Sequence, residues 1–212
     1  MSKLTIVDYG VGNLKSVKRA FEYAGGDVII TADPKQVSEA ERLVLPGVGA
    51  FGHCMQELDA RGLTDAVKSY AAKERPFLGI CVGMQIMLSV GEEFGEHKGL
   101  GFIEGRIKKI PAQDADGKPH VLPYIGWAAL HHSQAADWKN TPLQATPEGA
   151  HMYFLHSFSA HCADAAYAIA YYDYNGISVC AAINQAHMTG LQFHPEKSGE
   201  AGITIIKQFM SL

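Results

Sequence analysis

The chain has 212 residues, of which 47% are apolar and 19% are charged, a composition typical of a folded protein with one or at most two domains. Its formal net charge of -4 and the lack of a basic run argue against nucleic-acid binding. The longest uncharged stretch, residues 77–91, is shorter than the roughly 20 apolar residues that cross a bilayer, and the first residues do not resemble a signal peptide. We therefore expect a cytoplasmic protein without membrane-spanning segments.

The first half of the chain alternates β-prone runs with segments of helical periodicity. The predicted strands are residues 4–9, 28–30, 42–45 and 77–80. The predicted helical segments are residues 14–24, 36–41 and two pieces of 50–70 that are separated at Gly62. Strands that alternate with helices form a parallel sheet covered on both faces. The pattern therefore predicts an α/β fold with a mostly parallel central sheet.

From about residue 100 the chain is richer in Gly, Pro, Asn and aromatic residues, which predicts a smaller and partly antiparallel β region. The short apolar runs of this region are residues 153–155, 168–170 and 179–181. Residues 113–119 are predicted to form an exposed loop, and residues 202–212 a final helix that packs on the sheet. Because no linker or internal repeat divides the chain, we expect a single domain over residues 1–212.

A nucleophile elbow is predicted at Cys81, within the segment Gly79-Ile80-Cys81-Val82-Gly83. Glycines two residues before and two residues after the cysteine leave room for a tightly reversed backbone that pushes the side chain out above the sheet edge. A helix predicted to begin directly after Cys81 favours the thiolate over the thiol. A lone cysteine in an apolar run is more often a core residue, but the paired glycines favour the nucleophile.

A base for this nucleophile is predicted in the segment His194-Pro195-Glu196. Residues two apart on an extended chain point the same way, and Pro195 biases His194 toward an extended conformation. His194 then takes the thiol proton, while Glu196 orients the imidazole and supports its charged form. A surface turn is the alternative reading of this segment. Together with Cys81, however, the segment predicts a Cys-His-Glu triad.

The loop Pro46-Gly47-Val48-Gly49 is predicted to supply donors for an oxyanion. Gly47 and Gly49 free the backbone, so that N–H groups near Val48 can point at a substrate carbonyl oxygen. A plain turn and a phosphate cradle are the competing interpretations. The cradle is disfavoured because the Lys-Ser/Thr pair of a Walker loop is missing.

Other motifs favour core or surface roles. Lys15 stands where a dinucleotide-binding loop would need its third glycine, so no nicotinamide cofactor is expected. Three histidines spaced by five residues suit neither a helix face nor a strand face, so no metal site is expected at His151, His156 and His161. The cysteines expected to be buried are Cys54, Cys162 and Cys180. The charged residues expected at a solvated helix end are Glu92, Glu93 and residues 96–98.

The three motifs, in this order, resemble those of the class I (triad) glutamine amidotransferases over essentially the whole chain. Within that class, four segments resemble the glutaminase subunits of imidazole glycerol phosphate synthases: residues 8–14, 46–51, 126–127 and 193–199. The resemblance implies the three-layer, flavodoxin-like α/β fold of the class, with helices on both faces of the sheet, and it implies no cofactor.

The resemblance also implies an activity and a partner. Members of that family hydrolyse L-glutamine to glutamate through a cysteinyl thioester. They pass the ammonia to a (β/α)8 cyclase within a heterodimer that makes imidazole glycerol phosphate and AICAR in histidine biosynthesis. The implied catalytic residues are Cys81, His194 and Glu196. The implied oxyanion and substrate-binding residues are Gly47, Val48, Gly49, Gln85, His156, Ser157 and Phe158. The implied partner contacts are Gly126, Trp127 and Lys197.

One departure from the family pattern leaves other interpretations open. The family usually has Asn at the position of Ala128, and often His at that of Tyr124, in the segment that faces the cyclase. A paralogous glutaminase that feeds a different synthase, for example in bacterial surface-sugar biosynthesis, is therefore an alternative. A cysteine hydrolase or peptidase on the same fold is disfavoured by Glu196 and Gln85. A noncatalytic regulatory subunit is disfavoured by the intact triad.

Overall fold

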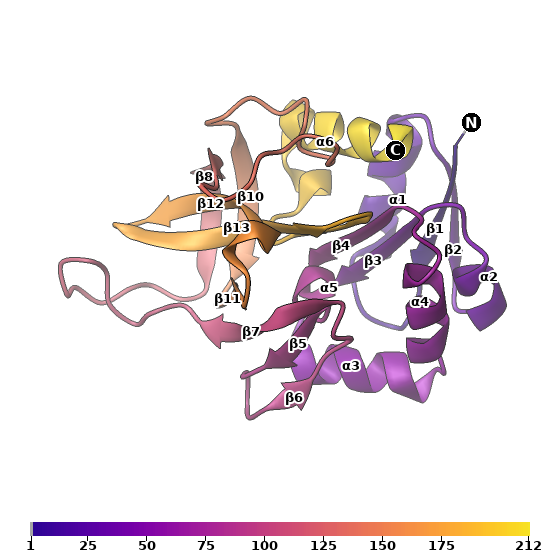
Figure 1. The fold of residues 1–212 in the computed structure, drawn as a ribbon, viewed down its shortest axis with the longest axis horizontal. Coiled ribbons are helices and arrows are strands. Elements are labelled where there is room, and N and C mark those ends of the chain that lie inside the picture. The colour runs from indigo at the N-terminus through magenta and orange to yellow at the C-terminus, as the bar shows by residue number, and fades with distance from the viewer. Residues whose placement is uncertain (1) are drawn as a thin grey trace.

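The computed structural model describes residues 2–212, and its largest element is an eight-stranded sheet (Figure 1). Its strands, in spatial order, are β2 (Asp27–Thr31), β1 (Lys3–Val7), β3 (Leu43–Gly47), β4 (Phe77–Cys81), β14 (Met188–Leu191), β13 (Ile177–Gln185), β12 (Ala168–Tyr174) and β9 (His131–His132). The strands from β2 to β14 are parallel, and β13, β12 and β9 continue the sheet antiparallel. The predicted α/β fold with a mostly parallel central sheet is thus confirmed.

Helices cover both faces of the parallel strands (Figure 1). They are α1 (Leu14–Tyr23), α2 (Pro34–Ser38), α3 (Phe51–Ala60), α4 (Thr64–Ala71), α5 (Val82–Gln85) and α6 (Gly199–Ser211). On one face α1 packs against α6, where the rings of Phe21 and Phe209 meet edge to face. On the other face α3 lies below the strands in the view of Figure 1. None of the helices within residues 2–212 is long and apolar enough to cross a membrane.

Two smaller sheets, built mainly from the second half of the chain, lie beside the large one (Figure 1). One contains β11 (Phe158–Cys162), β7 (Ile103–Lys109), β5 (Leu88–Gly91) and β6 (His97–Lys98), and the other pairs β8 (Tyr124–Ala129) with β10 (His151–His156). Two single-turn 3-10 helices are η1 (Ala165–Tyr167) and η2 (Pro195–Lys197). These sheets confirm the predicted smaller, partly antiparallel β region: β5 and β7 are parallel, and the other pairs are antiparallel. The predicted loop at 113–119 is also confirmed, because the Asp114 side chain closes it by accepting hydrogen bonds from the backbone of Asp116 and Lys118.

Three local predictions need correction. The helix after Cys81 is a single turn, because the chain pairs as β5 from Leu88 onward. The strand predicted at 42–45 continues through Pro46 and Gly47, which pair with β4 as the last two residues of β3. The last helix begins at Gly199 rather than at residue 202. A side chain at Gly202 would overlap the carbonyl oxygen of Pro195, so this glycine serves close packing rather than a helix start.

Candidate active site

Cys81 occupies a strained turn at the carboxyl end of β4. Its φ of +54° is in the left-handed region that non-glycine residues rarely adopt. A Cβ atom at Gly79 would lie 2.8 Å from the carbonyl oxygen of Gly83, and one at Gly83 would overlap the carbonyl oxygen of Leu45. Both glycines are therefore needed because the turn packs against itself and against β3. This is the backbone form of the elbow that the spacing predicts.

The helix behind this elbow is shorter than predicted. It comprises only the four residues Val82–Gln85, so few peptide dipoles are aligned behind Cys81. The short helix therefore favours a thiolate at Cys81 less than the predicted longer helix would. The neighbouring strand β14 brings further residues to the same sheet edge.

His194 and Glu196 lie at that edge because the carboxyl ends of parallel strands meet on one side of a sheet. His194 Nδ1 lies 2.8 Å from Glu196 Oε1, and the two side chains are 6% and 1% exposed. The backbone that carries them is anchored, since His194 N donates to the Tyr153 carbonyl oxygen and Ser198 Oγ donates to the His194 carbonyl oxygen. The structure thus brings together the three residues of the predicted triad.

The electrostatics of His194 favour its charged form. Burial alone lowers the pKa of His194, but hydrogen bonding to Cys81 and Glu196 outweighs burial and raises the pKa to about 10. The raised pKa favours an imidazolium ring next to Cys81 and Glu196. Burial raises the pKa of both Cys54 and Cys162 to about 11. Cys54 and Cys180 are buried as predicted, whereas Cys162 is half-buried.

Cys81 and His194 open into a cavity of about 370 Å³. Its walls are Val48, Gly49, Ala50, Cys81, Val82, Gln85, Glu93, Phe94, Pro123, Leu155, His156, Ser157, Phe158 and His194. Six of the seven predicted oxyanion and substrate-binding residues are in this set. Gly47 is not, because its α-carbon faces the protein interior, where a Cβ atom would lie 2.5 Å from Gly83 N and 2.8 Å from the Tyr9 hydroxyl.

The glycine loop beside the cavity is held by donors from the protein core. The Tyr9 hydroxyl donates to the Pro46 carbonyl oxygen at 2.6 Å, and the Cys54 thiol donates to the Val48 carbonyl oxygen at 3.4 Å. Gly49 has a φ of +91°, which allows the chain to turn from β3 into α3. The loop therefore reaches the cavity with its carbonyl groups at Pro46 and Val48 already bonded elsewhere.

Gln85 is a buried cavity residue whose amide N–H groups are both used. Gln85 Nε2 donates to the Phe158 carbonyl oxygen at 3.3 Å and to Gln192 Oε1 at 2.9 Å. A primary amide has only two N–H donors, so its oxygen is the group left for a ligand. Gln85 can therefore accept a hydrogen bond from a cationic or N–H group in the cavity.

Glu93 is a site residue that the sequence did not reveal. It belongs to no helix end, contrary to prediction, because the segment after β5 turns back into β6. Glu93 lines the cavity, and its Oε2 accepts a 2.9 Å hydrogen bond from the backbone N–H of Phe51, the first residue of α3. Its neighbours Glu92 and Glu96 instead pair with Arg106. No local pattern distinguishes Glu93, because its partner is far away in sequence.

His156 is buried and neutral. Its Nδ1 must donate to the Phe158 carbonyl oxygen at 2.8 Å, so its Nε2 accepts from the Tyr172 hydroxyl at 2.9 Å. Burial, helped by the nearby charge of His194, lowers the pKa of His156 to about 4 in spite of the raising effect of the Phe158 carbonyl. His151 and His161 are exposed and lie elsewhere on the surface. No group of side chains within residues 2–212 is arranged to hold a metal ion.

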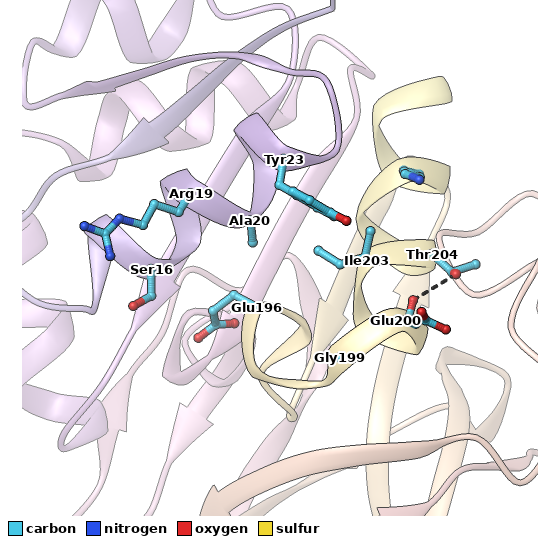
Figure 2. Close-up of a pocket in the computed structure, with 10 residues that line it drawn as sticks. Ser16, Arg19, Ala20, Tyr23, Glu196, Gly199, Glu200, Ile203 and Thr204 are labelled. Carbon is cyan, nitrogen blue, oxygen red and sulfur yellow. Dashed lines mark hydrogen bonds between the residues drawn. The ribbon is translucent and has the colours of Figure 1, made fainter.

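Glu196 contacts His194 but lines a groove other than the cavity of Cys81. Figure 2 shows its side chain between α1 and the start of α6, in a groove of about 810 Å³ that also contains Ser16 and Arg19. Cys81 and His194 do not line this groove. Within residues 2–212, Glu196 Oε2 has no hydrogen-bond partner, so the carboxylate engages the site through Oε1 alone.

The family model of "Glutamine amidotransferase class-I" matches residues 5–211, which is nearly the entire chain. The chain belongs to the class-I glutamine amidotransferase family. Curated proteins of similar length are similar to this chain over nearly its full length. The imidazole glycerol phosphate synthase subunit HisH 1 of Legionella pneumophila (strain Lens) is 45% identical over the full length of both chains. Subunit HisH of Geobacter sulfurreducens is 42% identical, covering 99% of this chain and 98% of its own.

Solved structures show the same amidotransferase fold at low sequence identity. The structure of PurLQS from Thermotoga maritima aligns with a TM-score of 0.72 at 19% identity, covering 99% of this chain and 97% of the other. A glutamine amidotransferase from Thermotoga maritima aligns with a TM-score of 0.58 at 15% identity, covering 92% and 76%. At these identities the likeness concerns the fold alone.

The amidotransferase cavity is flanked by an exposed apolar and basic patch, which we call the Trp127 patch: Ile125, Trp127, Tyr153 and Lys197. Trp127 is 52% exposed, and its ring meets that of Tyr153 edge to face at 6.0 Å. Lys197 Nζ lies 5.5 Å from the centre of the Tyr153 ring. Ala128 is only 8% exposed, so its side chain lies on the buried side of β8 and outside the patch.

Proposed function

We propose that this chain is the glutaminase subunit of an imidazole glycerol phosphate synthase, with residues 1–212 acting as one catalytic unit. The observation that carries the proposal is that Cys81 and His194 open into one cavity, with Glu196 Oε1 2.8 Å from His194 Nδ1. The chain's relatives at 40–45% identity are named imidazole glycerol phosphate synthase subunit HisH. In this function the protein hydrolyses L-glutamine to glutamate and supplies the ammonia to a synthase subunit.

In the proposed mechanism the Cys81 thiolate attacks the side-chain amide carbon of glutamine. The charged His194 then donates its proton to the amide nitrogen, and the carbon–nitrogen bond breaks to release ammonia and leave a thioester. Neutral His194 next takes a proton from water, which attacks the thioester to give glutamate and regenerate Cys81. Glu196 keeps the imidazole oriented through its contact at Nδ1.

Charge transiently formed on the carbonyl oxygen requires nearby N–H donors, and the loop at Val48 and Gly49 borders the cavity where Cys81 opens. The cavity also suits an amino acid. Gln85 Oε1 and the Glu93 carboxylate are acceptors for an α-ammonium group, while the backbone of residues 156–158 faces the cavity from β10 and β11. Gly47 supports this loop from behind rather than touching the substrate.

The proposed partner is a (β/α)8 cyclase that docks on the Trp127 patch and forms a heterodimer. A large exposed aromatic ring such as that of Trp127 is typical of an interface centre. The patch is continuous with the site, because the Tyr153 carbonyl oxygen accepts a hydrogen bond from His194 N. Gly126 lies in the same strand, β8, as Trp127. Ala128, the departure from the family pattern that favours a different synthase partner, is buried and points away from this surface. The departure therefore does not alter the proposed docking surface.

The decisive experiment measures glutamate release by the purified chain, alone and with a histidine-pathway cyclase and its ribulotide substrate. We expect stimulated release coupled to imidazole glycerol phosphate. Cys81→Ala should abolish glutamine-dependent synthesis while ammonia-dependent synthesis by the complex survives. Glutamate release without stimulation or binding by the cyclase would instead favour a paralogue that feeds another synthase. Cleavage of peptides or esters with no glutamine turnover would contradict the proposal.

A further inference from the structure

Gln192 is a fully buried polar residue directly after β14, two residues before His194. It is 0% exposed and does not line the cavity, so it contacts no substrate there. A buried primary amide destabilises the fold unless its donors and acceptor are bonded. The Gln192 amide makes its hydrogen bonds to Gln85 and Cys81.

The orientation of the Gln192 amide is determined by Gln85. Gln85 Nε2 donates to Gln192 Oε1 at 2.9 Å, so the amide oxygen of Gln192 faces Gln85. The amide N–H2 group consequently faces the other way, and Gln192 Nε2 lies 3.8 Å from Cys81 Sγ, within hydrogen-bond range of sulfur. The second donor bond of Gln85, to the Phe158 carbonyl oxygen, anchors this arrangement to β11.

Cys81 Sγ has two neutral contacts with opposite preferences. The Leu155 carbonyl oxygen, at 3.9 Å, can only accept, so it interacts favourably with the protonated thiol. The Gln192 amide can only donate to sulfur, so it interacts most favourably with the thiolate. An amide N–H keeps its proton at every working pH. This donor therefore stays in place whether His194 is charged or neutral.

We propose that Gln192 is a further catalytic residue that stabilises the thiolate of Cys81 by donating its amide N–H to Sγ, with Gln85 as the positioning residue that sets the amide orientation. The inference rests on the proposed function for the role of Cys81 as the nucleophile. Its chemical content is independent of glutamine, because it concerns the charge of one sulfur atom. It can therefore be tested without turnover.

The test is the pH dependence of Cys81 alkylation by iodoacetamide, followed by mass spectrometry of the peptide that contains Cys81. Gln192→Met has a similar side-chain length but no donor. We expect its alkylation rate at pH 7 to be about tenfold lower than that of the wild type, with the alkylation midpoint moved to higher pH, because the thiolate fraction falls. We also expect kcat for glutamine hydrolysis to fall about tenfold with little change in KM.

Gln85→Met should shift the alkylation profile in the same direction but by less, and should also raise KM because Gln85 lines the cavity.

Thr189→Val is the matched control. Thr189 is also buried on β14, and its hydroxyl donates to Asn184 Oδ1 at 2.8 Å, away from Cys81. This variant should lose stability without any change in the alkylation profile. If Gln192→Met does not fold, Gln192→Asn, which keeps the amide but shortens its reach, replaces it with the same expected direction.

An unchanged alkylation profile in a folded Gln192 variant would overturn the inference, even if the wild type hydrolyses glutamine. A shifted profile in a chain that releases no glutamate would support the inference and contradict the proposed function. The two failures are therefore distinguishable.

Discussion

The Tyr9 hydroxyl donates a 2.6 Å hydrogen bond to the carbonyl oxygen of Pro46 and so connects the segment after β1 to the glycine loop beside Cys81. Burial raises the pKa of Tyr9 well above its ordinary range, so the phenol remains a donor at every working pH. Tyr9→Phe leaves the buried carbonyl without this partner. We expect it to lower the free energy of unfolding by about 1–2 kcal/mol, measured by urea denaturation, and to reduce glutaminase activity.

Tyr70→Phe is the matched control for this prediction. Tyr70 is also buried and donates to the Pro76 carbonyl oxygen at 2.7 Å, but it lies before β4 rather than at the cavity. It should lose a similar amount of stability and keep its activity. Equal losses of activity in both variants would show that the Tyr9 contact has no particular connection to the loop.

Gly83→Ala is expected to disrupt the elbow, because the added methyl group would overlap the Leu45 carbonyl oxygen in the adjacent strand β3. Overpacking of a buried position costs about 1–3 kcal/mol or more. A backbone neighbour yields less readily than a side chain, so we expect a lower thermal midpoint and no glutaminase activity. Gly126→Ala is the control, since its nearest neighbour is the Tyr124 hydroxyl at 3.4 Å. Wild-type stability in Gly83→Ala would contradict the packing argument.

The pKa of His194, about 10, should fall in Cys81→Ala and in Glu196→Gln, because each variant removes a side chain that raises it. NMR titration of the imidazole measures this directly. The raised pKa means that the folded state favours the charged ring. Its contribution to the free energy of unfolding is therefore complete below pH 6.5 and is lost as the pH rises to about 10. An unchanged pKa in both variants would exclude the charged pair as the cause.

His156 should make the protein sensitive to acid. Its pKa is about 4 in the folded state and 6.5 ordinarily, so the unfolded chain binds the proton more readily. The stability from its neutral form is present above pH 6.5 and lost as the pH falls toward 4, by about 3 kcal/mol. Urea denaturation across this range should show a smaller loss for His156→Gln. Parallel curves for the two proteins would contradict this.

Trp127→Ala should weaken binding of the cyclase by tenfold or more, because truncating a central aromatic residue removes much of the buried area of an interface. Titration of the partner, with glutamate release as the signal, measures the effect. Basal glutamate release by the isolated chain should not change. Ile29→Ala, at an exposed position of the outer strand β2, is the control. If Trp127→Ala binds as the wild type does, the Trp127 patch is not the docking surface.

The alternation of strands and helices, the elbow at Cys81 and the pairing of His194 with Glu196 were all predictable from the sequence. Each depends on residues that are close along the chain: the glycines on both sides of Cys81, and the two-residue spacing that Pro195 holds extended. Local backbone geometry follows from local residue types, so such patterns are reliable.

Only the tertiary structure decided which distant groups share the site. Glu93 reaches the cavity because β5 and β6 turn back over α3, and no pattern near Glu93 records its bond to Phe51 N. Gln192 faces Cys81 because β14 pairs with β4 in a register that places their carboxyl ends side by side. Local residue patterns determined the elbow at Cys81 and the contact between His194 and Glu196. Strand pairing decided which distant groups surround Cys81, because the sheet, and not the chain order, makes those segments neighbours.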